Sequence, residues 1–163
     1  MKHVLVVCLL LSFWTGAALA QSSNGYTIFG AGAVTASGER SGALYFGGGG
    51  EGILHKIVGV GGEIGAATST RFQFALGLAS ANGYVHFTSN RRPRFDPFVT
   101  GGYTLLFGGG HLNLFNVGGG VNYWFQDRLG LRLEFRDHVL RDGGITGQYL
   151  AFRVGVCFRG GKD

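Results

Sequence analysis

The chain has 163 residues, of which 45% are hydrophobic and only 14% are charged, with a formal net charge of +5 at pH 7. Its 32 glycines follow no Gly-X-Y repeat, which excludes a collagen-like fibre, and its 13% aromatic content excludes a disordered linker. The basic residues are not interleaved with stacking aromatics across a surface, which argues against nucleic-acid binding.

Residues 1–20, "MKHVLVVCLLLSFWTGAALA", have the pattern of a secretory signal. Lys2 precedes an apolar run, and the small residues at 18–20 resemble a cleavage site. The run is too short for a spanning helix. The sequence therefore predicts a cleavable signal peptide over 1–20 and one exported domain over 21–163. A single cysteine, Cys157, follows the signal, so we expect no internal disulfide.

The rest of the chain predicts β-strands rather than helices. Many glycines among aromatic residues favour a strongly curved sheet. Turn-like stretches divide it into eight expected strands. Longer connections are expected after the first, third and seventh strands, and mostly short ones after the second, fourth and sixth. The expected strands span about 26–35, 42–53, 57–68, 80–89, 97–107, 113–125, 129–139 and 148–159.

The segment "LGLRLEFRDHVL" (129–140) shows the side-chain period most clearly. Its leucines and Phe135 occupy alternate positions, and the positions between them carry charged residues and a histidine. At 100° per residue these apolar residues would form no helical face, whereas on a strand they all point one way. The segment therefore predicts a strand with an apolar face and a charged face.

Two architectures fit this alternation. A soluble barrel turns its apolar face inward, and a membrane barrel turns it outward. The non-apolar face is mostly Gly, Ala and Asn, and no lysine falls within a predicted strand, so the sequence favours the membrane barrel. Lipid-facing arginine costs about 2–4 kcal/mol at mid-bilayer. The predicted interior polar network is Glu63, Arg132, Glu134, Arg136 and Arg153, with Glu51 as a further candidate. The predicted lipid-facing residues are Val121, Tyr123, Leu131, Leu133, Phe135, Phe152, Val154, Val156 and Phe158.

A turn over 126–128 sets a specific register between the sixth and seventh strands. It places Gly120 opposite Glu134 and Gly118 opposite Arg136 inside the barrel, where glycine leaves room for long charged side chains. On the outer face the same register pairs Val121 with Leu133 and Tyr123 with Leu131. Aromatic residues near strand ends predict two interfacial bands. One band contains Tyr123, Phe125 and Phe158, and the other contains Phe107 and Phe115.

Three stretches carry a family resemblance: 95–107, 115–140 and 149–158. They resemble the last four strands of the small eight-stranded outer-membrane β-barrels of Gram-negative bacteria, the OmpA/OmpX-like family. This resemblance implies an all-β, antiparallel, up-and-down transmembrane barrel in the cell outer membrane, with both termini and the short turns in the periplasm. It also implies assembly by the barrel-assembly machinery, although Phe158 is followed by "RGGKD" rather than ending the chain.

The expected function is non-enzymatic, with a structural or surface-interaction role for a monomer in outer-membrane lipid. The alternatives are a narrow solute channel, an envelope lipid-modifying enzyme and a soluble exported barrel that binds a ligand. Scattered histidines predict no metal site, and the glycine runs open no helix that would hold a nucleotide, so no cofactor is expected. His86 and Thr88 depart from the His-x-Ser spacing of barrel lipid A deacylases. No extracellular ligand is indicated.

Overall fold

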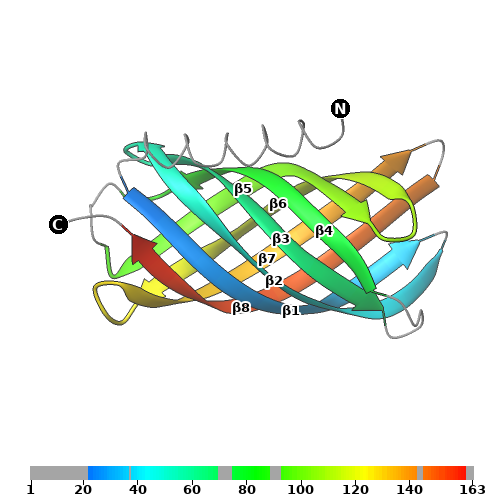
Figure 1. Ribbon diagram of the computed structural model, residues 1–163, viewed down its shortest axis with the longest axis horizontal. Coiled ribbons are helices and arrows are strands. Elements are labelled where there is room, and N and C mark those ends of the chain that lie inside the picture. Colours follow the sequence, from blue (N-terminus) through cyan, green and yellow to red (C-terminus); the bar gives the residue numbers. More distant parts are fainter. Residues whose placement is uncertain (1–21, 37, 70–74, 89–92, 143–144, 161–163) are drawn as a thin grey trace, which may run out of the picture.

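A computed structural model of the chain describes residues 22–36, 38–69, 75–88, 93–142 and 145–160, with only the backbone described at 22, 141–142 and 145–146. Eight antiparallel strands follow one another around a closed barrel, each hydrogen-bonded to its neighbours in sequence, and β8 pairs with β1 (Figure 1). The strands are β1 (Ser22–Ala36), β2 (Glu39–His55), β3 (Val58–Ser69), β4 (Ala75–His86), β5 (Phe95–Phe107), β6 (His111–Trp124), β7 (Leu129–Asp142) and β8 (Ile145–Gly160).

The strand register sets the width of the barrel. A row of paired residues that starts at Asn24 passes once around all eight strands and returns to β1 at Val34, a displacement of ten residues from 24 to 34. With eight strands, this stagger corresponds to a tilt of about 40° and an interior that side chains can fill. The alternation along each strand therefore sends every second side chain into a narrow lumen.

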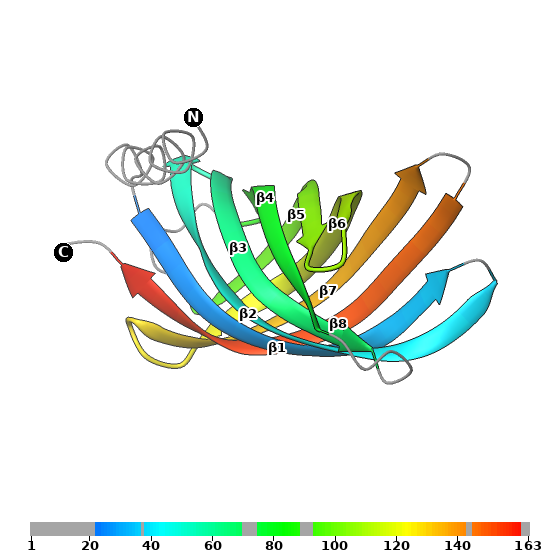
Figure 2. The same cartoon turned by 45° about the vertical axis from the view of Figure 1, so that its right-hand side comes forward.

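Both ends of the strand sequence lie at one end of the barrel. The start of β1 and the end of β8 are on the left in Figures 1 and 2, and the β1–β2 and β7–β8 hairpins close on the right. We call the end with Ser22 and Gly160 the terminal rim, and the other end the opposite rim. The connections β2–β3, β4–β5 and β6–β7 lie at the terminal rim.

The predicted contrast in connection length is wrong. β1 ends at Ala36 and β2 begins at Glu39, and β7 and β8 are separated only by residues 143 and 144. β4 and β5 are separated by residues 87–94, of which 87–88 and 93–94 are described, so the largest separation between consecutive strands is at the terminal rim. The polar stretch 36–41 was expected to be a loop, but Ala36 and Glu39–Ser41 continue the ladder because each finds a partner on the neighbouring strand, as Arg40 does with Thr35. The fourth strand likewise spans Ala75–His86 rather than 80–89.

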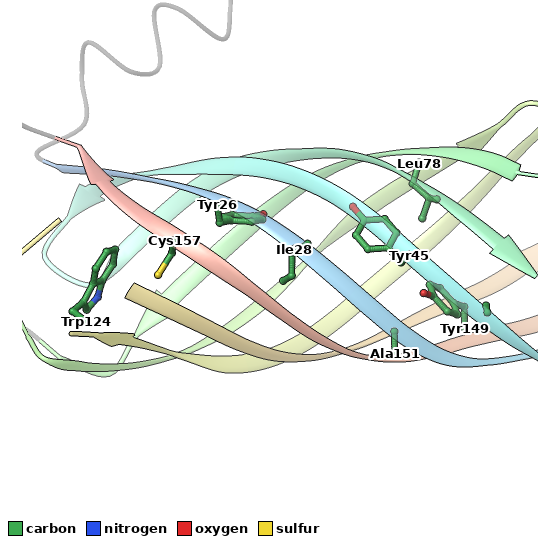
Figure 3. Packing of buried hydrophobic residues seen from close by; sticks show 9 residues of the cluster. Tyr26, Ile28, Tyr45, Leu78, Trp124, Tyr149, Ala151 and Cys157 are labelled. Atoms are coloured by element: carbon green, nitrogen blue, oxygen red, sulfur yellow. The ribbon is translucent and has the colours of Figure 1, made fainter. Parts of the chain in front are cut away.

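The centre of the barrel contains an aromatic and aliphatic cluster as well as charges. Figure 3 shows Tyr26, Ile28, Tyr45 and Trp124 inside the ring of strands, and all four are buried. The ring of Tyr45 occupies space above Gly47 and Gly65, where a Cβ would overlap its hydroxyl group. Glycine at these positions therefore lets the tyrosine lie flat against the inner wall and extend toward the middle of the lumen.

Residues 1–20, the predicted signal peptide, lie outside the described residues. Within the described part of the chain, no helix is long and apolar enough to cross a membrane. The predicted barrel domain of 21–163 corresponds to strands that run from Ser22 to Gly160.

Candidate functional site

The interior of the barrel is charged and its exterior is apolar. On β7, Arg132 and Arg136 have no exposed surface, whereas 51% of Phe135 is exposed between them. The structure places all five residues of the predicted interior network, and Glu51, in the lumen as buried side chains. The two-residue period of a strand is sufficient to place these side chains inside the barrel, because successive residues point to opposite faces.

The register between β6 and β7 is confirmed. Gly120 pairs with Glu134, Gly118 with Arg136, Val121 with Leu133 and Tyr123 with Leu131. The two glycines differ in what they make room for. A Cβ on either glycine would overlap a backbone carbonyl of β7, that of Phe135 at Gly118 and that of Leu133 at Gly120, but a Cβ on Gly120 would also meet the ring of Phe98 at 2.9 Å. The space at Gly120 is therefore used by an aromatic ring that supports a charged group.

Glu134 lies at the centre of the interior network. Its carboxylate accepts a hydrogen bond from Nε of Arg132 at 3.0 Å. Nε of Arg136 lies 2.6 Å from the other oxygen, and Nη1 of Arg153 lies 3.5 Å from it. Three guanidinium groups from two adjacent strands thus surround one carboxylate. Such burial is tolerable only because each ion has oppositely charged partners.

A second carboxylate, Glu63 on β3, binds two of the same arginines from across the lumen. Nη2 of Arg153 lies 2.5 Å and Nη1 of Arg136 lies 3.7 Å from Oε2 of Glu63. The hydroxyl groups of Tyr26 and Tyr45 donate to the same carboxylate at 2.9 and 2.7 Å. Ion pairs across the lumen therefore join β3 to β7 and β8.

A third group of charges lies nearer the terminal rim, and sequence reasoning did not predict it as a unit. Nδ1 of His86 is 3.0 Å from both carboxylate oxygens of Asp96, and its Nε2 is 3.7 Å from Glu51. Glu51 accepts a hydrogen bond from the Asn24 amide at 2.9 Å and lies 3.9 Å from Nη1 of Arg132. Arg132 therefore links this group to the Glu134 cluster.

Aromatic rings complete the environment of Arg132. Its guanidinium carbon lies 4.1 Å from the ring centroid of Phe98 and 4.3 Å from that of Tyr26. Arginine stacks well on aromatic faces, and a stacked guanidinium still donates hydrogen bonds in its own plane. The aromatic residues predicted from the sequence lay on the outer face, so these interior rings were not anticipated.

Neutral polar groups fill the lumen toward the opposite rim. The Ser80 and Thr104 hydroxyl groups are 2.8 Å apart, and the Asn116 amide donates to Thr104 at 3.0 Å. Beyond them the ring of His138 stacks on that of Tyr149 with centroids 5.4 Å apart. Ionic, hydrogen-bonded and aromatic layers thus occupy successive levels of the lumen.

The outer face carries large apolar side chains. Seven of the nine predicted lipid-facing residues are exposed on it, and Phe152, for example, is 57% exposed. The other two, Val121 and Leu133, are half-buried and pair with each other at outward positions of β6 and β7. Exposed aromatics gather in two bands. The band at the terminal rim contains Phe87, Phe95, Tyr123, Phe125 and Phe158. The second band contains the cross-strand pairs Phe29–Phe46, Tyr103–Phe115 and Phe135–Phe152. Phe107 lies at the end of β5, beyond this second band.

The spacing of the two bands matches a membrane interior. Phe95 and Tyr103 are eight residues apart on β5, and Phe115 and Tyr123 are eight apart on β6. At about 3.4 Å per residue and a tilt of about 40°, eight residues rise about 20 Å along the barrel axis. Outer-membrane barrels have an apolar band about 25 Å tall between aromatic girdles.

The comparisons with known proteins find the fold among solved structures. No family model and no curated protein matches the chain. The N-terminal β-barrel domain of Pseudomonas aeruginosa OprF aligns with a TM-score of 0.62 at 17% identity, covering 86% of this chain and 100% of that chain. Neisserial surface protein A aligns with a TM-score of 0.66 at 10% identity, covering 83% and 96%. Ail of Yersinia pestis, in complex with the heparin analogue sucrose octasulfate, aligns with a TM-score of 0.53 at 11% identity, covering 85% and 99%.

The fold is that of the small eight-stranded outer-membrane β-barrels. The predicted fold class, an all-β, eight-stranded, antiparallel up-and-down barrel, is confirmed, as is the predicted resemblance. The chain shares this architecture with the three proteins. Sequence identities of 17% or less show a common fold and do not show a common activity.

The interior groups are arranged for mutual stabilisation. Among the described residues, no group of three His, Cys, Asp or Glu side chains is placed to hold a metal ion. His86 is buried in the lumen against Asp96, so its imidazole does not face the outer surface where a lipid substrate would lie. Cys157 is also buried and points into the lumen (Figure 3). Both side chains therefore face the interior of the barrel, where His86 has Asp96 as its partner.

Proposed function

We propose that the protein is an exported, non-enzymatic barrel that spans the outer membrane and acts as a structural or surface-contact element of the cell envelope. The observation that carries this proposal is the inverted distribution of side chains. Arginine and glutamate are sealed inside, and phenylalanine, valine and leucine cover the outside. In water this exterior would leave a continuous apolar surface around the barrel, which soluble monomers avoid.

A lipid bilayer accommodates both the apolar exterior and the charged interior. Lipid tails solvate the apolar outer face, and barrel closure satisfies every strand edge, which a membrane interior requires. The interior charges meet one another instead of lipid. Because a single chain closes the barrel, the fold needs no second copy, which supports a monomer.

The proposed orientation places the terminal rim in the periplasm. It follows the family topology, in which both termini are periplasmic. The opposite rim would then face outward, but two of its hairpins are tight, with β2 starting at Glu39 and β8 at Ile145. Surface contacts would therefore involve strand ends and the rim itself more than long loops.

Lumen contents argue against the channel alternative. Arg132, Glu134, Arg136 and Arg153 meet in the middle of the barrel, and each is at most 2% exposed. A conducting path would have to break several short ion pairs at once. We expect planar-bilayer recordings to show no steady conductance, and a stable open pore in the wild type would replace the structural proposal with the channel.

The deciding experiment combines membrane fractionation with gel mobility. Folded outer-membrane barrels migrate differently before and after boiling, so the protein should appear in the outer-membrane fraction with heat-dependent mobility. Purified protein that stays monodisperse in buffer without detergent would refute the proposal and favour the soluble ligand-binding barrel. A change in envelope lipid composition after gene deletion, detected by mass spectrometry, would favour the lipid-modifying enzyme.

A further inference from the structure

Basic side chains form a ring around the terminal rim. Among the described residues, each of the three connections at this end carries an exposed basic residue: Lys56 between β2 and β3, Arg94 between β4 and β5, and Arg128 between β6 and β7. Arg159, near the end of β8, adds a fourth. Asp127 is the acidic residue that accompanies them in the described parts of these connections.

The ring lies immediately outside the aromatic band. Arg94 precedes Phe95, which is 61% exposed, and the Arg94 guanidinium lies 5.8 Å from the ring centroid of Tyr123. Arg128 is separated from the exposed Phe125 by two residues. Aromatic side chains of membrane proteins sit at the headgroup level, so basic groups just beyond them reach the level of lipid phosphates.

Among the residues whose side chains are described, the opposite rim lacks this excess of positive charge. Its exposed described residues include Glu39 and Arg40, which have opposite signs, and Asp137 is an outward-facing acid on β7. The described connection 108–110 consists of glycine. The charge asymmetry between the two rims is therefore a property of the folded barrel rather than of its overall composition.

We propose that the terminal rim binds the headgroups of anionic phospholipids, with Lys56, Arg94 and Arg128 as the contacts. Arg159 has a structural role instead. It stacks over Trp124 at 4.0 Å and donates to the backbone carbonyl groups of Asp127 and Pro93, so it closes the lumen and holds two turns in place. This inference rests on the proposed membrane location.

The binding strength follows from the charge of each contact. Each basic residue close to an anionic membrane surface increases the affinity for that surface about fivefold. Exposed charges act only within a Debye length, so salt weakens the attraction. The ring should therefore enrich a phosphatidylglycerol-type lipid over a zwitterionic one about fivefold per contact, and the enrichment should shrink in high salt.

The test uses the full mature protein in nanodiscs with equal amounts of phosphatidylglycerol and phosphatidylcholine. Lipids that remain bound after detergent trimming are counted by native mass spectrometry. Wild type should retain phosphatidylglycerol and phosphatidylcholine in a ratio of about five to one or more. The triple variant K56Q/R94Q/R128Q should lose most of this enrichment, and the control R40Q, at the opposite rim, should match wild type.

Two outcomes separate the claims. Wild type that fails to enter nanodiscs overturns the membrane proposal itself. Wild type that enters them but retains both lipids equally, or a triple variant that keeps the full enrichment, overturns the headgroup site and leaves the membrane barrel intact. Heat-dependent gel mobility of the triple variant shows that it is folded before its lipids are counted.

Discussion

Glu134 is the residue whose charge the interior depends on most. We predict that Glu134→Gln, which keeps the shape and removes the negative charge, destabilises the folded barrel. Arg132 and Arg136 lose their nearest carboxylate contacts, at 3.0 and 2.6 Å. Arg153 loses a weaker one at 3.5 Å but keeps Glu63 at 2.5 Å. The loss of electrostatic stabilisation therefore falls mainly on the buried guanidinium groups of Arg132 and Arg136.

The magnitude follows from what those two groups retain. Arg132 still donates to Asn122 at 3.3 Å and lies 3.9 Å from Glu51, and Arg136 still lies 3.7 Å from Glu63. None of these contacts replaces a short charge-assisted bond. Each such bond contributes about 1.5–3 kcal/mol, and breaking a buried ion pair costs about 3–5 kcal/mol. We therefore expect the free energy of unfolding to fall by about 3–5 kcal/mol.

The assay is equilibrium urea unfolding in lipid vesicles. Trp124 is buried in the lumen and is the single tryptophan after residue 20, so its fluorescence reports the loss of the barrel interior. With a slope of about 2 kcal/mol per molar urea, the midpoint should fall by about 2 M. The matched control is Asp137→Asn, which removes a half-buried carboxylate from the same strand but leaves an oxygen to accept the hydrogen bond from Gln148, and it should change stability by less than about 0.5 kcal/mol. Equal effects of the two substitutions would refute the reasoning that Glu134 is an indispensable buried counter-ion.

Three further predictions test packing, orientation and access. Gly120→Ala should cost about 1–3 kcal/mol because its Cβ would overlap a backbone carbonyl and an interior ring, whereas Gly101→Ala, with its nearest neighbour at 3.6 Å, should be nearly neutral; similar unfolding midpoints would contradict this. Leu133→Arg, midway between the aromatic bands, should cost about 2–4 kcal/mol in vesicles and Phe125→Arg about 0–1, so equal penalties would argue against a lipid-facing surface. Cys157 is 1% exposed and should react with a maleimide only after unfolding, so rapid labelling of the folded protein would place it outside the lumen.

Local alternation was sufficient to place the clearest strands and their faces. In β7 every second residue from Leu129 to Phe135 is apolar. This period of two fits a strand, whereas on a helix the same residues would not form one apolar face. The tight turn after Phe125 then dictated the pairing of Gly120 with Glu134, because a fixed turn length sets the register of a hairpin. These inferences succeeded because they depend on residues adjacent in the chain.

Loop lengths could not be obtained in this way. The polar residues Thr35 and Arg40 have the composition of a loop, but they pair across the β1–β2 hairpin. Whether such residues join a ladder depends on the neighbouring strands, which supply the hydrogen-bond partners. A closed barrel supplies a partner on both sides of every strand and so extends strands into polar sequence.

Contacts across the lumen were decided only by the closed barrel. Glu63 on β3 meets Arg136 on β7 and Arg153 on β8 because barrel closure with a stagger of ten residues brings these levels together. The alternation in a single strand tells which side chains enter the lumen, whereas barrel width and stagger determine which of them touch, because those quantities belong to all eight strands at once.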